Sequence, residues 1–260
     1  MASRPEYRRA RRAYGQNFLA DPQSIRTVMA AAEIKPDLLV YEVGAGRGRL
    51  TNALLDVGAR VIAYEVDPAM AAALPHHPRL RVDSDFLAAD PPGEPFAVVG
   101  NIPYALTSAV VDWCLAAGSM TTATLLVQWE YARKRTGDYG RWSRLTIATW
   151  PVIGWRLAGR IPRTAFRPVP GVDGGVLQLT RRVVPLVPAR VMPAYEQMVD
   201  WGFRGVGGSL QASLERRYRG VAGAFRAARI PPDRPVGEVW PEQWLTVFRL
   251  LHRRGITSNE

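Results

Sequence analysis

Short apolar runs alternate with segments of helical periodicity from residue 21 to about residue 130, and this alternation limits the folds open to the chain. The apolar runs, which predict strands, lie at 38–41, 60–64, 80–82, 96–99 and 123–127. The first helical pattern follows Asp21-Pro22, a typical N-cap with proline behind it. Strands and helices alternating at this spacing favour a parallel sheet with helices on both faces. Two later runs, at 152–157 and 176–179, predict further strands.

The pattern changes after Arg182. Residues 183–188 are rich in valine and proline and are predicted to be a linker. Beyond them only helical patterns occur, such as Trp244, Val247, Phe248 and Leu251 at helical spacing. We therefore expect a basic arm at 1–13, an α/β domain at 14–183 and a small helical domain at 184–260.

Composition excludes several classes of protein. With 260 residues, 47% of them hydrophobic and 22% charged, the chain has enough apolar material for a core. It has no run of about 20 apolar residues and no apolar stretch behind the N-terminus, so we expect neither a transmembrane helix nor a secretory signal. We therefore expect a cytoplasmic location. One cysteine and three histidines are too few for a zinc site, so we expect no metal.

The net charge of +11 is unevenly distributed. Residues 13–132 carry seven basic and thirteen acidic groups, whereas residues 133–182 carry eleven basic and two acidic groups. Among the 34 basic residues only Lys35 and Lys134 are lysines. A GC-rich genome would explain the arginine excess but not the clustering. We interpret the acidic half as a small-ligand site and the basic segment as a surface for a polyanion, which we expect to be a nucleic acid.

A glycine-rich turn follows the first predicted strand. It reads Glu42-Val43-Gly44-Ala45-Gly46-Arg47-Gly48 and differs from the G-x-G-x-x-G of dinucleotide sites. Its acidic residue would repel a pyrophosphate, but S-adenosylmethionine has no phosphate and carries a sulfonium cation. Glu65 and Asp85 end the next two strands, where they could accept hydrogen bonds from ribose hydroxyls and from the adenine amine. Each acid alone could be a solvated loop residue; together with the glycines they predict a cofactor site.

Asn101-Ile102-Pro103-Tyr104 follows the fourth predicted strand. The exocyclic amine of adenine is a poor nucleophile because its lone pair is delocalised into the ring. The amide oxygen of Asn101 and the carbonyl of Ile102 could accept the two amine hydrogens, while Pro103 fixes the backbone that presents this carbonyl. Tyr104 offers a ring face for a flipped base. The segment therefore predicts catalysis by positioning and polarisation, although a structural turn is the alternative reading.

These motifs, with Gly15-Gln16-Asn17-Phe18-Leu19 and Phe166-Arg167-Pro168-Val169-Pro170, resemble the rRNA adenine N6-methyltransferases. That family includes the Erm macrolide-resistance enzymes and the KsgA/Dim1 dimethyltransferases. The resemblance implies a Rossmann-like class I methyltransferase sheet with a small C-terminal helical domain. It also implies that Asn17 and Leu19 contact the cofactor and that Phe166 stacks on the adenine opposite Tyr104. The predicted cofactor-binding residues are Asn17, Leu19, Gly44, Gly46, Glu65, Val66, Asp85, Phe86 and Asn101.

The segment 128–135 and the short C-terminal region look closer to actinomycete Erm proteins than to KsgA. The predicted activity is methylation of one adenine in 23S rRNA. We expect the protein to be a monomer and to bind this RNA before or during ribosome assembly. The predicted RNA contacts are Arg133, Lys134, Arg135, Arg141, Arg144, Arg160, Arg163 and Arg167. The sequence Asp173-Gly174-Gly175 departs from the serine-bearing version common in the family, and we expect it to lie away from the chemistry.

Three alternatives stay open at this point. They are a small-subunit rRNA dimethyltransferase of the KsgA type, a catalytically silent RNA-binding protein on a methyltransferase fold, and a DNA adenine methyltransferase. DNA enzymes usually show Asp-Pro-Pro-Tyr and a separate target-recognition region. The sequence does not say whether one or two methyl groups are added.

Overall fold

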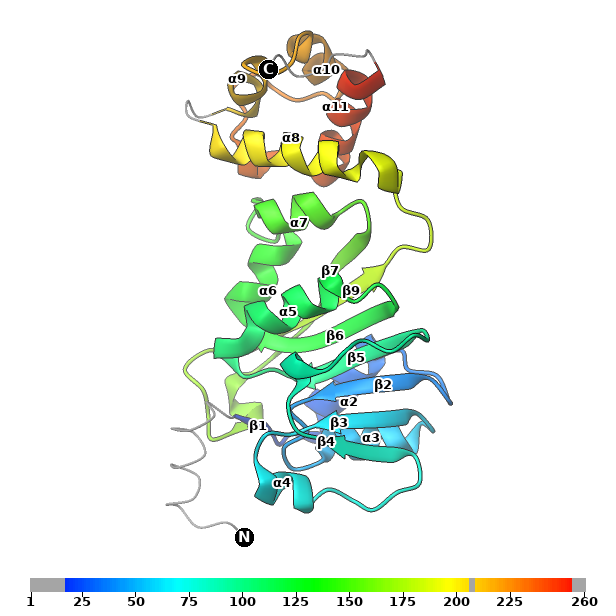
Figure 1. The fold of residues 1–260 in the computed structure, drawn as a ribbon. Helices are drawn as coiled ribbons and strands as arrows, with labels where there is room; N and C mark the ends of the chain where they lie inside the picture. The colour runs from blue at the N-terminus through cyan, green and yellow to red at the C-terminus, as the bar shows by residue number, and fades with distance from the viewer. Residues whose placement is uncertain (1–16, 206–208, 254–260) are drawn as a thin grey trace. The chain divides into compact units, whose positions relative to one another are not determined.

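The structure, a computed structural model, describes residues 17–205 and 209–253 (Figure 1). The predicted basic arm at 1–13 lies outside these residues. The chain divides into two compact units, one within Met1–Ala132 and Arg156–Arg181, the other within Arg133–Trp155 and Arg182–Glu260. The second unit thus takes in a segment that the sequence analysis placed in the α/β domain, and the division at 183/184 stays a prediction.

Within the described residues the main sheet has seven strands in the order β4-β3-β2-β5-β6-β9-β7. They are β2 (Leu39–Val43), β3 (Arg60–Tyr64), β4 (Leu80–Asp83), β5 (Phe96–Asn101), β6 (Met120–Gln128), β7 (Ile153–Ile161) and β9 (Gly174–Arg181). Strands β2 to β6 pair in parallel, as predicted. β9 runs antiparallel to β6; the sequence analysis predicted this later strand but gave it no orientation. The strand order reverses beside β2, where open α/β sheets bind their ligands.

Helices cover both faces of the sheet in the first unit, as the sequence predicts. The helices α2 (Pro22–Ala32) and α3 (Arg49–Asp56) lie behind the sheet in Figure 1, and α5 (Thr107–Ala116) lies in front of it. The predicted cap of α2 is confirmed, since Asp21 accepts a hydrogen bond from Ser24 N–H at 2.8 Å. Asp67 caps α4 (Pro68–Ala72) in the same way. The apolar faces of α2 and α3 join the strands in one core around Val28, Val40, Leu54, Val61 and Ala97.

The second unit is built mainly from helices. These are α7 (Arg144–Thr149), α8 (Met192–Arg204), α9 (Leu210–Glu215), α10 (Val221–Ala227) and α11 (Pro241–Arg253), while α6 (Trp129–Thr136) begins in the first unit and ends in the second. The predicted apolar face of α11 is confirmed, because Trp244, Val247, Phe248 and Leu251 are all buried. They pack with Tyr195, Met198 and Phe225 in a core separate from that of the sheet.

Five short 3₁₀ turns are described: η1 (Phe86–Ala88), η2 (Tyr104–Leu106), η3 (Arg163–Ala165), η4 (Ala189–Val191) and η5 (Val236–Glu238). A two-stranded ribbon outside the main sheet was not expected. It joins β1 (Phe18–Leu19) to β8 (Phe166–Arg167), with Leu19 opposite Phe166. Strands of two residues carry no periodicity, so nothing in the sequence pattern could have paired them.

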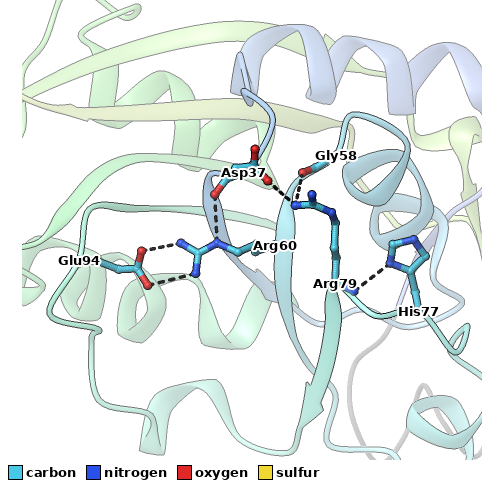
Figure 2. A network of polar contacts seen from close by, with 6 residues as sticks. All are labelled: Asp37, Gly58, Arg60, His77, Arg79 and Glu94. Carbon is cyan, nitrogen blue, oxygen red and sulfur yellow. Dashed lines mark hydrogen bonds and ion pairs between the residues drawn. The ribbon is translucent and has the colours of Figure 1, made fainter.

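A polar network joins the loops that enter the strands at their amino ends (Figure 2). Arg60, at the start of β3, forms a two-pronged ion pair with Glu94 and donates to the backbone oxygen of Asp37 at 3.1 Å. Arg79 pairs with the carboxylate of Asp37 and donates to Gly58 O at 3.3 Å. These groups are exposed, so the network mainly fixes the loop geometry at this edge of the sheet.

Among the described residues, the structure has no helix with the length and apolar character needed to cross a membrane.

Candidate active site

A cavity of about 360 Å³ opens at the carboxyl ends of β2, β3, β4 and β5, all within the first unit. Its walls include these predicted residues: Asn17, Gly44, Gly46, Glu65, Val66, Asp85, Phe86, Asn101, Ile102, Pro103, Tyr104 and Phe166. Leu19 is the exception, because it is buried in the core and contacts a smaller neighbouring cavity. Most of the predicted residues are therefore brought together, although their roles stay predictions.

The glycine turn has the backbone that its sequence suggests. Gly46 has a φ of +52°, a conformation that residues with a Cβ rarely adopt. A Cβ at this position would also lie 2.9 Å from Cδ1 of Phe18, whose ring covers the turn. Glycine is thus required both by the turn and by the close approach of a ring from β1.

Glu65 is fixed by backbone donors on both sides. It is 3% exposed, its Oε2 accepts from Gly46 N–H at 2.7 Å and its Oε1 accepts from Asp67 N–H at 2.9 Å. A carboxylate oxygen can accept more than one hydrogen bond, so both oxygens keep capacity for hydroxyl donors. This geometry suits the predicted contact with a ribose.

Glu42 is the most deeply buried acid of the site, with 1% of its surface exposed. Its Oε2 accepts from the Thr51 hydroxyl at 2.6 Å, while Oε1 has no hydrogen-bond partner within the described residues. Burial raises the pKa of Glu42 to about 7. Glu42 borders the smaller cavity together with Gly44 and Asn101, so an acid that was not among the predicted cofactor-binding residues lies beside the site.

Asp85 and Phe86 form the side of the cavity after β4. Asp85 is exposed and caps η1, since its Oδ1 accepts from Leu87 N–H at 2.9 Å. Phe86 is buried, and the centroid of its ring lies 5.5 Å from the ring centroid of Tyr64 and 4.3 Å from that of Trp113. The polar group and the apolar wall that a purine needs are thus adjacent residues.

The Asn101–Tyr104 segment leaves the sheet at the end of β5. Asn101 donates from Nδ2 to Asn17 O at 2.7 Å, which turns Oδ1 the other way as an acceptor. Ile102 N–H donates to Leu126 O at 3.0 Å and so ties the segment to β6. The hydroxyl of Tyr104 is buried with no partner among residues 17–205 and 209–253, and burial raises its pKa to about 12. Tyr104 therefore stays protonated at neutral pH.

Phe166 borders the same cavity as Tyr104 but is only 1% exposed. It packs in the core of the first unit through its pairing with Leu19. A base could stack on its face only if this wall opened, so the predicted stacking stays a prediction. Residues that the sequence analysis did not select also border the cavity, and they are Phe18, Val43, Tyr64, Ser84, Leu87, Ala105, Leu106 and Val110.

The basic residues predicted to meet RNA are engaged to different degrees. Arg133, Arg144 and Arg160 form ion pairs with Asp138, Asp200 and Asp173, respectively. Arg135 is partly buried and donates to the hydroxyl of Ser143 at 3.0 Å. Lys134, Arg163 and Arg167 are exposed, and so is Arg141, whose Nη2 lies 4.0 Å from a carboxylate oxygen of Glu238. Net charge along the sequence cannot show which cations already have a carboxylate nearby.

Comparison with known proteins shows the family of the chain. Residues 7–253 match the family described as ribosomal RNA adenine dimethylase. The chain belongs to this family. It is 52% identical to an rRNA adenine N-6-methyltransferase of Streptomyces fradiae, over 94% of this chain and 79% of that protein. The family resemblance drawn from the sequence is thereby confirmed.

A solved structure of the family has the same fold. The crystal structure of the 23S rRNA methyltransferase ErmE superposes with a TM-score of 0.87 at 49% identity and covers 91% of this chain and all of that one. A ribosomal RNA small subunit methyltransferase A of Thermobifida fusca is 38% identical over 82% of this chain and 79% of that protein. The chain therefore has a class I methyltransferase fold and is more similar to the ErmE side of the family.

A methyltransferase of this fold uses S-adenosylmethionine as methyl donor, and the residues present fit that group. Within residues 17–205 and 209–253, Glu42 Oε1 and Asn17 Oδ1 are buried acceptors without a hydrogen-bond partner, and acceptors of this kind suit an ammonium group. Glu65 offers oxygens to ribose hydroxyls, and the apolar side chains of Val66 and Phe86 flank space for a purine. Acid groups beside apolar walls match a cationic nucleoside.

Proposed function

We propose that this protein transfers a methyl group from S-adenosylmethionine to the N6 amine of an adenine in 23S rRNA and so confers resistance to macrolide-type antibiotics. The observation that carries the proposal is the orientation of Asn101, whose amide nitrogen is held by Asn17 O so that its oxygen can accept from an amine. Similarity to ErmE supports 23S rRNA over small-subunit rRNA, and the intact catalytic segment argues against a silent binding protein.

The chain's own residues would bind the cofactor in three places. Glu65 would accept from the ribose hydroxyls, Asp85 from the adenine amine, and the acceptors of Glu42 and Asn17 would receive the ammonium end. When bound, the cofactor supplies an electrophilic methyl group on sulfur. Because Glu42 is buried and has a raised pKa, a cation placed against it would favour its ionised form.

The target amine would be activated by two acceptors. Asn101 Oδ1 and the carbonyl of Ile102 would each accept a hydrogen bond from one N–H of the amine, which favours a pyramidal nitrogen whose lone pair is free to attack. The methylated nitrogen would then release one proton to solvent. Tyr104, neutral at physiological pH, would support one face of the flipped base by stacking. The rate enhancement would come from orientation and polarisation, and no strong base is required.

Methyl transfer to isolated RNA tests the proposal. Purified protein with radiolabelled S-adenosylmethionine is expected to label protein-free 23S rRNA, with label recovered as N6-methylated adenosine. Small-subunit particles should acquire little label. Labelling of the small-subunit particles in preference to 23S rRNA would instead support the KsgA-type activity, and RNA binding without any methyl transfer would support a silent binding protein.

The RNA surface is tested by charge reversal. Changing the exposed Lys134 and Arg163 to Glu should weaken binding to 23S rRNA fragments and flatten its salt dependence by about one unit of slope per lost phosphate contact. Arg26→Glu with Arg219→Glu is the charge-matched control, since both arginines are exposed and lie outside residues 133–182. Equal losses in the two double variants would show that only net charge matters, and would move the RNA surface elsewhere.

A further inference from the structure

Asp173 lies between β8 and β9, and three different segments donate hydrogen bonds to it. Its Oδ1 accepts from Arg163 N–H at 2.8 Å, and its Oδ2 accepts from Arg160 Nε at 2.8 Å. Its backbone oxygen accepts from the N–H of Trp129, the first residue of α6, at 3.0 Å. The side chain is only 19% exposed. One residue therefore joins the end of β7, the start of η3 and the start of α6.

The glycines after Asp173 place this junction against Phe166. A Cβ on Gly174 would lie 3.1 Å from Cζ of Phe166 and 2.8 Å from Cδ1 of Leu126. A Cβ on Gly175 would lie 2.7 Å from Cβ of Ala132 on α6. The chain passes so close to both neighbours that the position of the Phe166 ring depends on where this turn is held.

The junction also reaches the other wall of the cavity. β9 pairs with β6, with Gly174 opposite Gln128, and β6 pairs with β5, with Leu126 opposite Asn101. Burial raises the pKa of Tyr104, and the negative charges of Asp173 and Glu130 raise it further. Asp173 is thus linked to the segments that carry both predicted aromatic walls.

We propose that Asp173 is a positioning residue for methyl transfer: by binding Arg160 and the backbone of Arg163, it fixes the turn that packs against Phe166 and, through β9 and β6, the strand that ends at Asn101, and so sets the shape of the cavity in which the target amine is placed. This inference rests on the proposed function and revises our expectation that Asp173-Gly174-Gly175 lies away from the chemistry. The carboxylate form is needed because both of its partners are donors. An amide in its place would turn a donor toward one of them.

The test compares Asp173→Asn with Glu94→Gln, which removes a carboxylate paired with an arginine at the other end of the strands. Asp173→Asn is expected to lower kcat for RNA methylation about tenfold, while KM for RNA and the cofactor Kd stay within twofold. Glu94→Gln should leave all three unchanged. Arg160→Gln, which keeps the Arg163 bond to Asp173, should lower kcat by a smaller factor in the same way.

An unchanged kcat in Asp173→Asn overturns the inference. So does a loss of cofactor affinity that parallels a loss of thermal stability, because that is the signature of a merely structural residue. If Asp173→Asn does not fold, Arg160→Gln decides: a lowered kcat supports positioning, whereas a raised KM with normal kcat makes this pair an RNA contact. Absence of methyl transfer by the unmodified protein would overturn the proposed function as well, and so is distinguished from a failure of this inference alone.

Discussion

Acidic side chains at the two ends of the parallel strands differ in their burial and in their hydrogen-bond partners. At the amino ends, Asp37 and Glu94 are exposed and paired with Arg79 and Arg60 (Figure 2). At the carboxyl ends, Glu42 and Glu65 are buried and receive hydrogen bonds from a hydroxyl and from backbone N–H groups.

This difference indicates which of these carboxylates can still bind a ligand. The pKa of Glu94 is lowered by its bond to Arg60, whereas burial raises the pKa of Glu42 to about 7. An acid neutralised by an arginine contributes to loop geometry and has little left to offer a ligand. A buried acid without a cation is costly in the folded protein and is retained where a ligand can compensate for it.

The largest expected effect is that of Asn101→Ala at the carboxyl ends. Removing the amide should lower kcat by about 10²–10³, in line with the loss of one preorganised polar group at a reacting centre. Cofactor affinity should change far less, because the amide is directed at the amine. Single-turnover methylation with calorimetry separates the two quantities. A nearly normal rate would remove Asn101 from the mechanism.

Glu65→Ala should instead weaken binding of the cofactor. The change removes the acceptor of two backbone N–H groups, which lowers stability, and of the ribose hydroxyls. Cofactor Kd should rise about tenfold or more, since a hydrogen bond to a charged group contributes about 1.5–3 kcal/mol. Calorimetric titration with S-adenosylhomocysteine measures this. Unchanged affinity would contradict the ribose assignment, and Glu94→Ala is the control from the opposite end of the strands.

Gly46→Ala is expected to weaken cofactor binding by about tenfold, because the left-handed backbone costs about 1–2 kcal/mol for a residue with a Cβ. The new methyl group would also displace the ring of Phe18. The matched control is Gly93→Ala, where a Cβ meets no atom within 4 Å. Equal affinities in both variants would show that the turn tolerates a side chain.

The smallest expected effects concern pH: Glu42 at the carboxyl ends of the strands and Glu94 at the amino ends should change the stability of the fold in opposite directions as pH rises. The pKa of Glu42 is higher in the folded protein than in the unfolded chain. Its contribution to stability is therefore fully present below about pH 4.5 and is lost as pH rises through about 7. Glu42→Gln should therefore show a smaller fall in thermal midpoint between pH 5 and 8 than the unmodified protein. Glu94 has a lowered pKa, so its contribution is present above about pH 4.5 and lost in acid. A parallel pH profile for Glu42→Gln and the unmodified protein would refute the assignment.

Much of the first unit was predictable because its signals are local. Caps such as Asp21 and Asp67 and the apolar runs of the strands act within a few residues. The parallel order of β2 to β6 follows from strand–helix alternation. The antiparallel β9 was not predictable, since its pairing with β6 joins residues about fifty positions apart and no turn sequence specifies it.

The sequence by itself determined the family, the strand ends that carry Glu65, Asp85 and Asn101, and the glycines of the turn. These features depend on residue type and spacing, which a linear chain displays in full. Only the tertiary structure decided that Phe166 is buried, that Arg135 and Arg160 already have partners, and that Asp173 joins three segments. Burial and pairing depend on which distant segments pack together, and that information appears only when the chain is folded.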